Sequence, residues 1–450
     1  MTEIPMGRPA QTVAEVEDAL LSRWPETRLE PSLDRIRAFV DYLGDPQHQY
    51  DVIHITGTNG KTSTARIIDS LLRAMNLRTG RFTSPHLERI NERISVDGDP
   101  LSDEDFVFAF NDIAPYTHLV DADQPYPLSF FETVVGMAYA AFADKPVDVA
   151  IVEVGMGGSW DATNVADGRV AVITPIGMDH ADYLGSTLPA IAREKAGIIK
   201  PGATVVVAKQ DPDALEVIRE QAREVGATVL EEGVDFEVVS SIAGVGGQLI
   251  AVRLGTTVYD EIFLPLHGAH QAQNAALAMA AVRALIETDL EGEVVGEALA
   301  NATSPGRLEI VRSSPTIILD AAHNPHGAAA TVAALEESFN FDPIIGVISA
   351  MADKDVEGML AVLEPALEHV VITQNSQDRA MRADRLGAVA IEVFGEDRVT
   401  VVPDLANALD AAMALSESDG HDSISSGAIL VTGSVVTAGE ARVLTARRVR

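Results

Sequence analysis

A glycine-rich segment between an expected strand and an expected helix constrains this chain more than any other feature of its sequence. Residues 51–55 place apolar side chains at 52, 53 and 55, as in a buried strand, and apolar residues from Ile67 to Met75 recur with helical spacing. The segment Gly57-Thr-Asn-Gly-Lys-Thr62 stands between them. A glycine turn at a helix N-terminus aims successive backbone N–H groups at one point, where the helix dipole adds positive potential. The segment therefore predicts a binding site for a polyanion.

Within this loop, Lys61 is expected to lie along the β- and γ-phosphates of a nucleotide, and the Thr62 hydroxyl to reach a Mg²⁺ ion. The match to the G-x-x-x-x-G-K-[ST] pattern is incomplete, because Ile55 stands where the first glycine belongs and that glycine comes at Gly57. A glycine turn followed by a surface lysine would explain the same letters without a ligand. The flanking strand and helix favour the phosphate site, whose expected nucleotide contacts are Gly57, Thr58, Asn59, Gly60, Lys61 and Thr62.

The bulk composition limits the class of protein and its partners. A chain of 450 residues is long for one hydrophobic core, so two domains are expected. The net charge of −34 opposes nucleic-acid binding, and the absence of cysteine excludes disulfides and thiol chemistry. Residues 1–24 show no signal peptide, and no apolar run approaches the roughly 20 residues that cross a bilayer. We expect a cytoplasmic protein with small-molecule partners and neither a nucleic-acid nor a membrane partner.

Strands that alternate with helix-length segments predict an α/β fold with mostly parallel sheets. The stretch 233–266 is richer in strand-forming residues and predicts a small β excursion. Proline and glycine adjoin in residues 301–309, which we interpret as a hinge between a domain of residues 1–300 and one of residues 301–450. Strands of the second half run into polar residues such as Asp320 and Asn375, so this half has a ligand-binding edge of its own.

Polar residues at strand ends form a candidate magnesium site. Glu153 ends a dense apolar strand, His180 follows a later strand, and Ser84 follows an earlier one. Such hard ligands suit Mg²⁺, and a carboxylate buried without a partner would be costly. A helix-capping glutamate and a hydrogen-bonded structural histidine would account for each residue singly. As a group beside a phosphate loop, they favour metal binding.

Two further segments allow more than one interpretation. Lys195 forms an ion pair with Glu194 or Asp179, or else burial makes its amine neutral and able to take up CO₂ as a carbamate that holds a second Mg²⁺. Gln271 and Asn274 share a helix face, where their amides either read the edge of a purine or supply ordinary polarity near a helix N-terminus.

The second half carries a candidate phosphate clamp. Arg307 directly follows the hinge glycine, and an arginine at a hinge suits closure over a γ-phosphate. Asp320 ends a strand, and His323 follows it in the same segment. We expect the acid and the histidine to orient ribose or a second substrate.

These segments together resemble the folylpolyglutamate synthases and dihydrofolate synthases, which are ATP-dependent amide ligases of the Mur ligase-like superfamily. The first motif, TGTNGKTS, is shared across the superfamily, whereas SPHL, DATN, EKAG and AHNP together are specific to this branch. The motifs run in the family's order from residue 56 to residue 434, so the similarity covers nearly the whole chain. The others that carry it are FFE, EVGMGG, DH..YLG, HQ..N, GRLE, DKD and TGS.

The resemblance implies an N-terminal P-loop ATPase domain of Mur ligase type and a C-terminal Rossmann-like α/β domain, with the active site in the cleft between them. It implies ATP, two Mg²⁺ ions, L-glutamate, a folate or dihydropteroate acceptor and a monomeric enzyme. It assigns Lys61, Thr62, Asn274, Arg307 and Asp320 to the nucleotide, His323 to the nucleotide or glutamate, Thr62, Ser84, Glu153, His180 and a carbamylated Lys195 to magnesium, and Ser129, Phe131 and Asp161 to the pteroate pocket. The catalytic group it implies is Lys61, Lys195, His180, Arg307 and His323.

Three positions depart from the family pattern. Ser159 replaces the usual arginine after the glycine pair, which removes a charge partner near Asp161. Ser129 in place of threonine and Ala321 in place of glycine are milder changes.

The expected reaction passes the γ-phosphoryl group of ATP to a substrate carboxylate, and the amine of glutamate then attacks the acyl phosphate. A muropeptide ligase of the same superfamily shares the loop, but the SPHL and AHNP segments count against it. A nucleotide-dependent switch or a P-loop kinase would give binding, hydrolysis or phosphoryl transfer without an amide product. Acceptance of dihydropteroate, and the number and linkage of added glutamates, are open on the sequence alone.

Overall fold

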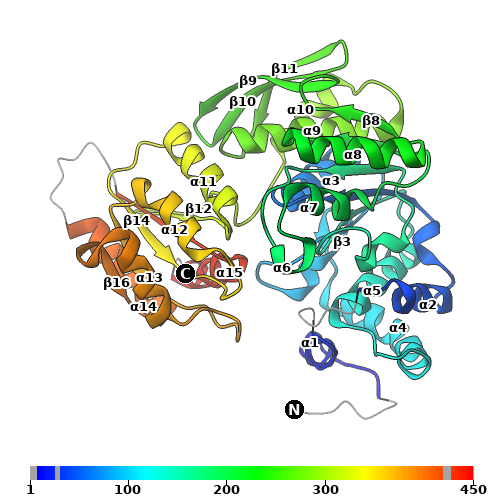
Figure 1. The fold of residues 1–450 in the computed structure, drawn as a ribbon, viewed down its shortest axis with the longest axis horizontal. Helices are drawn as coiled ribbons and strands as arrows, with labels where there is room; N and C mark the ends of the chain where they lie inside the picture. Colours follow the sequence, from blue (N-terminus) through cyan, green and yellow to red (C-terminus); the bar gives the residue numbers. More distant parts are fainter. Residues whose placement is uncertain (1–7, 26–30, 419–426, 449–450) are drawn as a thin grey trace. The chain divides into compact units, whose positions relative to one another are not determined.

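A computed structural model describes residues 8–25, 31–418 and 427–448 and divides them into two compact units (Figure 1). The first unit takes in the described chain up to Val239 together with Ala251–Ile262 and Gln273–Ala302. The second takes in Ser240–Ile250, Phe263–Ala272 and the described chain from Thr303 onward. The first seven residues, on which the signal-peptide argument partly rests, lie outside the described residues.

The first unit is built on an eight-stranded sheet of order β4-β3-β2-β5-β1-β6-β7-β8. From β2 to β8 the neighbouring strands run parallel, and β3 and β4 add an antiparallel edge. This confirms the expected α/β fold with a mostly parallel sheet. The strands are β1 (Asp51–Thr56), β2 (Thr79–Phe82), β3 (Ile94–Val96), β4 (Asp99–Pro100), β5 (Val149–Glu153), β6 (Val170–Ile173), β7 (Thr204–Val207) and β8 (Thr228–Glu231).

The central strands are apolar on both faces because helices cover both sides of a parallel sheet. Strand β5 is fully buried, and Ile53 of β1 pairs with Ile151 of β5 on one side and Val170 of β6 on the other. The helices of this unit are α1 (Val13–Leu21), α2 (Asp34–Tyr42), α3 (Lys61–Ala74), α4 (Asp103–Asp123), α5 (Phe130–Asp144), α6 (Ala181–Leu184), α7 (Leu188–Ala196), α8 (Pro212–Val225) and α10 (Gly292–Ala300), with short 3₁₀ turns η1 (Pro46–His48), η2 (Ile90–Arg93) and η3 (Ala162–Val165).

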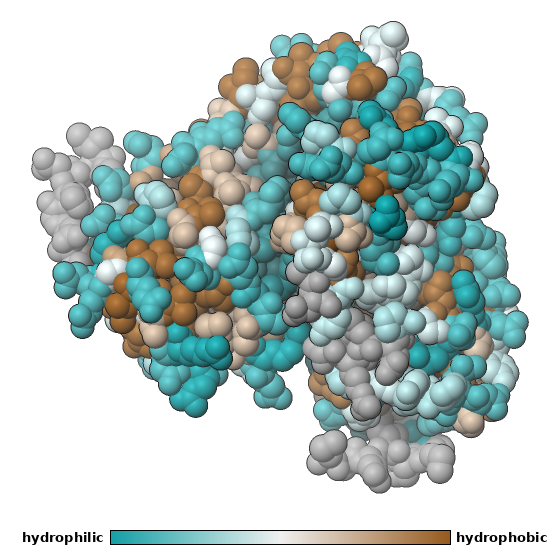
Figure 2. Space-filling view, in the orientation of Figure 1, coloured by the Kyte–Doolittle hydropathy of each residue, from teal (hydrophilic) through white to brown (hydrophobic). Residues whose placement is uncertain are grey.

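The predicted β excursion is a three-stranded sheet of order β11-β10-β9, followed by helix α9 (Ala269–Ile286). Its strands are β9 (Phe236–Gly244), β10 (Gly247–Leu254) and β11 (Thr257–Leu264), joined by tight turns. One set of side chains, including Ile250 and Leu264, is buried, while Ile242 and Leu249 are exposed. In Figure 2 apolar residues lie among hydrophilic ones at the top of the view, where Figure 1 draws this sheet.

The second unit contains a six-stranded sheet of order β12-β13-β17-β14-β15-β16, parallel except for β12. The predicted strands of this half are present, but β12 was not foreseen because an edge strand with half-exposed residues lacks an apolar run. Its strands are β12 (Glu309–Ser313), β13 (Thr316–Leu319), β14 (Ile344–Ile348), β15 (His369–Ile372), β16 (Val399–Val401) and β17 (Ala428–Thr432). Its helices are α11 (Pro325–Ser338), α12 (Val356–Leu363), α13 (Ala383–Phe394), α14 (Leu405–Ser418) and α15 (Val435–Arg448), with turns η4 (Glu364–Ala366) and η5 (Glu396–Arg398).

Among the described residues, no helix combines the length and the apolar character that crossing a membrane requires.

A buried ion pair joins α3 to β2 in the first unit. Arg81 Nη1 donates to Asp69 Oδ2 at 2.7 Å, and both side chains are at most 3% exposed. Asp69 also accepts from the Thr79 hydroxyl at 2.6 Å, and Arg81 donates to Ser95 at 3.0 Å. A charge held this deep depends on its partner, since its own hydration is lost.

Asp69→Asn is expected to lower the free energy of unfolding by about 3–5 kcal/mol, because it leaves the Arg81 guanidinium buried without a carboxylate. Chemical denaturation of the variant measures the loss. The double variant Asp69→Leu with Arg81→Met removes both charges and is expected to recover most of it. Equal stability of the single variant and the unaltered protein would contradict this account.

Candidate active site

The glycine loop between β1 and α3 leaves no space for side chains at its two glycines. Gly57 has φ +144°, and a Cβ added there would lie 1.9 Å from Thr174 Oγ1. Gly60, the N-cap of α3, has φ +90°, and its Cβ would lie 2.6 Å from Asn274 Oδ1. Only glycine adopts these conformations without strain. The structure thus places Asn274 of α9 against the loop, where its amide must lie if it is to contact the purine of a bound nucleotide.

Gly57→Ala is expected to weaken ATP binding about five- to 150-fold, because relieving the contact with Thr174 must displace the loop backbone at a cost of about 1–3 kcal/mol. Calorimetric titration with ATP measures the change. Gly226→Ala is the matched control, since Gly226 also has positive φ, +67°, but has open space around it. Equal effects of the two variants would show that the close contact is unimportant.

Backbone and side-chain bonds fix the loop to the end of β6. Thr58 N–H donates to the Pro175 carbonyl at 3.0 Å, and the Thr58 hydroxyl both donates to the Gly177 carbonyl and accepts from the Gly177 N–H. Strands β1 and β6 are parallel neighbours, so their carboxyl ends lie at the same edge. The loop is held in shape by its surroundings rather than by its own sequence alone.

Two lysines converge on one backbone carbonyl in this loop. Lys61 Nζ donates to the Gly57 and Thr58 carbonyl oxygens, both at 3.1 Å, and Lys195 Nζ of α7 donates to the Gly57 oxygen at 2.8 Å. Lys195 is 5% exposed. Burial, and next the charge of Lys61, lower the pKa of Lys195 to about 7, against the opposing pull of Asp179, Asp161 and Glu194. A buried lysine with this pKa has a substantial neutral fraction, which carbamate formation needs.

Of the predicted magnesium ligands, Thr62 and Glu153 are in direct contact. The Thr62 hydroxyl lies 3.0 and 2.9 Å from the two carboxylate oxygens of Glu153, which is 1% exposed at the end of β5. Ser84 is half-buried in the turn after β2, and the His180 ring, after β6, lies 3.9 Å from Asp179. Within the described residues, no three Asp, Glu or His side chains form a ready-made metal cluster.

Two of the three predicted pteroate residues, Phe131 and Asp161, lie beside one backbone stretch. The Phe131 ring packs so closely on Gly155 that a Cβ there would lie 2.4 Å from Phe131 Cζ. Asp161 accepts from the next backbone N–H, that of Met156, at 2.9 Å. Ser129 caps α5, and its hydroxyl accepts from the Glu132 N–H at 3.2 Å. The structure therefore brings Phe131 and Asp161 together, while the Ser129 side chain has a helix-capping role.

Ser159, which stands where the family usually has arginine, forms two hydrogen bonds with Glu194. Its hydroxyl donates to Glu194 Oε1 at 2.6 Å, and its N–H donates to the Glu194 carbonyl at 3.0 Å. Gly197 lies so near that a Cβ there would be 2.4 Å from the Ser159 Cβ. The serine thus ties the segment before Asp161 to the end of α7, next to Lys195.

Within the second unit, the residues predicted to handle phosphate and substrate share one loop cluster. The Asp320 carboxylate, 4% exposed, accepts from the Leu308 N–H, the Ala322 N–H and the Thr331 hydroxyl. These bonds hold the segment containing Arg307 against the end of β13. The Arg307 side chain donates to the Gly306 carbonyl at 3.1 Å. His323 Nδ1 lies 3.0 Å from the Ala321 carbonyl.

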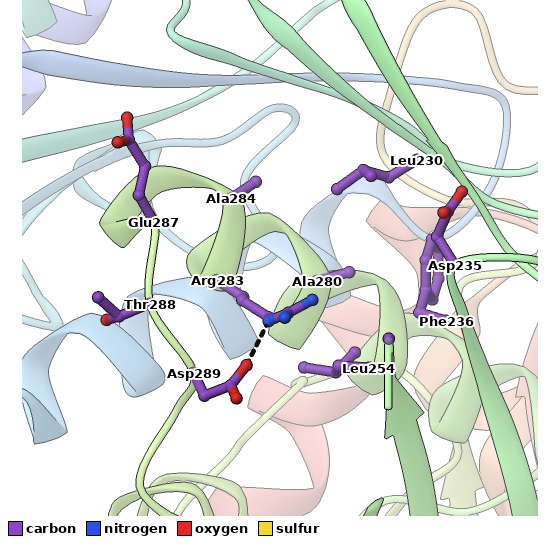
Figure 3. Close-up of a pocket in the computed structure, with 11 residues that line it drawn as sticks. Leu230, Asp235, Phe236, Leu254, Ala280, Arg283, Ala284, Glu287, Thr288 and Asp289 are labelled. Carbon is purple, nitrogen blue, oxygen red and sulfur yellow. Dashed lines mark hydrogen bonds and ion pairs between the residues drawn. The ribbon is translucent and has the colours of Figure 1, made fainter. Parts of the chain in front are cut away.

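The first unit also contains a pocket of about 430 Å³ between α9 and the start of β9 (Figure 3). At its rim, Arg283 Nε donates to Asp289 Oδ1 at 2.8 Å, so the one basic group is neutralised locally. None of the predicted site residues lines it. The pocket is lined by Leu230, Asp235, Phe236, Leu254, Gly255, Ala280, Arg283, Ala284, Glu287, Thr288 and Asp289.

Sequence reasoning missed two residues beside the site, His54 and Thr163. His54 is fully buried in β1, and its Nε2 lies 2.8 Å from the Thr163 hydroxyl oxygen. The signal was a histidine within an otherwise apolar strand, directly before the phosphate loop. A polar ring at such a position needs a buried partner.

Two family models match the chain, the Mur ligase middle domain over residues 117–282 and the Mur ligase glutamate ligase domain over residues 306–435. A Mycobacterium tuberculosis protein named dihydrofolate synthase/folylpolyglutamate synthase is 46% identical over 99% of this chain and 96% of its own length. A solved structure of M. tuberculosis folylpolyglutamate synthase complexed with ADP and AMPPCP gives a TM-score of 0.92 at 47% identity, covering 96% of this chain and 98% of that one. E. coli FolC in complex with DHPP and ADP gives 0.85 at 30% identity, covering 98% and 99%.

Proposed function

This chain belongs to the dihydrofolate synthase/folylpolyglutamate synthase family of Mur ligases, and on that basis we propose a residue-level account of how it joins L-glutamate to a folate. It is an ATP-dependent carboxylate–amine ligase that adds glutamate to reduced folates. We propose that dihydropteroate is also an acceptor and that the reaction proceeds through an acyl phosphate. A free carboxylate is a poor acyl donor, and phosphorylation gives it phosphate as a leaving group.

The glycine loop holds the phosphates of ATP. Backbone N–H groups from Gly57 to Thr62 cradle them, and the Lys61 ammonium, which lies against the Gly57 and Thr58 carbonyls, turns to the β- and γ-phosphates. Asn274, packed on Gly60, contacts the adenine. Lys61 offsets the negative charge that ATP and the acceptor carboxylate bring together as the γ-phosphoryl group moves.

Thr62, Ser84, Glu153, His180 and a carbamylated Lys195 hold two Mg²⁺ ions. The contact between the Thr62 hydroxyl and the Glu153 carboxylate supports this assignment, because adjacent hard oxygen atoms suit magnesium. The lowered pKa of Lys195 supports a carbamate, which needs a neutral amine. When bound, Mg²⁺ neutralises negative charge on the phosphates and the acceptor carboxylate.

Phe131 and Asp161 form the acceptor pocket, with Ser129 at the start of α5. The ring of Phe131 offers a face on which a pterin stacks, and Asp161 accepts hydrogen bonds from its amino and amide groups. The position of both residues beside Gly155 and Met156 supports a single pocket. Because Ser159 stands where the family usually has arginine, Asp161 lacks a positively charged neighbour at that position, and the pocket is more acidic.

In the second domain, which we place at residues 301–450 after a first domain of residues 1–300, Arg307 binds a phosphate. Asp320 and His323 contact the nucleotide or the incoming glutamate. The shared loop cluster of these residues supports a common ligand. We also propose that the enzyme works in the cytoplasm, the compartment expected from its sequence.

The convergence of Lys61 and Lys195 on the Gly57 carbonyl, beside the Thr62–Glu153 contact, is the observation that carries this proposal. The experiment measures phosphate release from MgATP and L-glutamate with dihydropteroate, with a reduced folate monoglutamate, or with neither. We expect release and a mass gain of one glutamate with both acceptors. Product from the folate alone would restrict the enzyme to chain extension, and release independent of any acceptor would overturn the residue assignments.

A further inference from the structure

Three buried side chains form a continuous hydrogen-bonded line from the centre of the sheet to the acceptor pocket. His54 Nε2 of β1 lies 2.8 Å from Thr163 Oγ1, and Thr163 Oγ1 lies 2.5 Å from Asp161 Oδ1. All three residues are at most 3% exposed. The Thr163 N–H donates to the same Asp161 oxygen at 2.9 Å, and the Tyr139 hydroxyl of α5 donates to the Thr163 carbonyl at 2.7 Å.

The direction of each bond follows from the number of available protons. An ionised carboxylate only accepts, so the single Thr163 hydroxyl proton goes to Asp161. The Thr163 oxygen must then accept from His54, which makes His54 the neutral tautomer protonated on Nε2. Burial lowers the pKa of His54 to about 3, so the ring is uncharged at neutral pH.

The second ring nitrogen of His54, Nδ1, is a buried polar atom whose burial opposes folding. His54 Nδ1 is buried and finds no hydrogen-bond partner among the described residues. Buried polar atoms are rarely left so. An apolar residue in β1 would avoid the cost, so the histidine is better explained by what its Nε2–H does for Thr163 than by packing.

We infer that His54 is a positioning residue for the acceptor pocket: through the Thr163 hydroxyl it holds the Asp161 carboxylate in one orientation and keeps it ready to accept from the pterin. The inference rests on the proposed role of Asp161. Without the His54 donor, the Thr163 hydroxyl is free to rotate its proton away from Asp161. The carboxylate then loses one of its interior donors and part of its fixed orientation.

The surroundings of Asp161 fix the direction of the effect. Burial raises the pKa of Asp161 to about 6, while donors from Thr163, Met156 and Gly155 oppose the rise. The charged or titratable groups that act on this network are Lys195 of α7, Tyr139 of α5 and, at His54, Lys200. Loss of a hydrogen-bond donor to the ionised carboxylate raises the pKa of Asp161 further. As the pH is lowered, Asp161 should therefore become protonated, and pterin binding should be lost, at a higher pH than in the unaltered enzyme.

A matched pair of variants tests the inference. His54→Met keeps the length of the side chain but has no donor, and His54→Gln keeps an N–H near the Nε2 position. We expect His54→Met to raise the KM for the folate acceptor about threefold or more, with the KM for ATP and for glutamate unchanged. The pH below which the KM for the folate acceptor rises should increase by about half a unit, because a threefold change in the protonation equilibrium of Asp161 shifts its pKa by that amount. His54→Gln is expected to restore both.

Two further variants keep the outcome decisive. Thr163→Val removes the hydroxyl itself and should raise the acceptor KM about tenfold, which decides the matter if His54→Met does not fold. Tyr139→Phe removes the hydrogen bond to the Thr163 carbonyl and leaves His54, Thr163 and Asp161 unaltered. Burial raises the pKa of Tyr139 well above 10, so the phenol is uncharged near neutral pH and its loss should leave the pH profile in place.

If His54→Met and His54→Gln both match the unaltered enzyme, the positioning role is wrong. Asp161→Asn separates this from the proposed function. An unchanged acceptor KM in Asp161→Asn would overturn the pocket assignment and the inference built on it. A raised KM there, with no effect of either His54→Met or Thr163→Val, would overturn the inference alone.

Discussion

Replacing Lys61 with alanine is expected to lower turnover by about a thousandfold or more. The lysine is held at the glycine loop by the Gly57 and Thr58 carbonyls, from which we propose that its ammonium turns to the γ-phosphate. Because the reaction brings an anionic acceptor to an anionic nucleotide, loss of this cation costs more in the transition state than in the ground state. The measurement is acceptor-dependent phosphate release at saturating ATP.

Lys145→Ala is the matched control for Lys61→Ala. Lys145 belongs to the same unit, but its Nζ forms a half-exposed ion pair with Asp105 at 2.8 Å, and such pairs contribute about 1 kcal/mol or less. Turnover of this variant should equal that of the unaltered enzyme. A Lys61→Ala enzyme that keeps turnover within tenfold of the control would remove the loop from the mechanism.

Replacing Lys195 is expected to have the second-largest effect, a loss of about a hundredfold or more in kcat. If Lys195 acts as a carbamate, Lys195→Arg should be as inactive as Lys195→Ala, since an arginine stays cationic and takes up no CO₂. Added formate or acetate should restore part of the activity of Lys195→Ala by supplying a carboxylate. Full activity of Lys195→Arg would mean that the residue works as a cation.

The pKa of Lys195 also fixes a pH dependence. Because the folded-state pKa is about 7, protonation below that pH removes the neutral amine, and activity should fall with a CO₂-dependent acidic limb. As the pH is lowered, Lys195 takes up its proton near pH 10.5 in the unfolded chain but only near pH 7 in the folded protein. Stability should therefore decrease as the pH falls from about 10.5 to about 7, and this contribution should be constant below it. A pH–activity profile at low and high bicarbonate measures the first effect.

Local features of the sequence were enough to predict the strand, the glycine turn and the helix around Lys61. Apolar periodicity and the positions of glycines are patterns of a few neighbouring residues, so they can be recognised in the sequence before the fold is known. The same holds for the β excursion and for the strands of the second half, apart from the half-exposed edge strand β12. The order of the motifs along the chain identified the family.

The tertiary structure alone decided which of these residues meet. Lys195 reaches Gly57 over a separation of 138 residues, and His54 reaches Thr163 over 109. Both contacts depend on β1 lying between β5 and β6. Gly57 follows β1 at the edge where these parallel strands end, whereas His54 lies within β1 and contacts Thr163 in the connection from β5 to β6. The same packing excludes water from Lys195 and so lowers its pKa. This effect depends on burial, which the spacing of residues along the sequence does not reveal. The sequence thus determined the parts of the site, and strand order and burial determined their contacts and charge states.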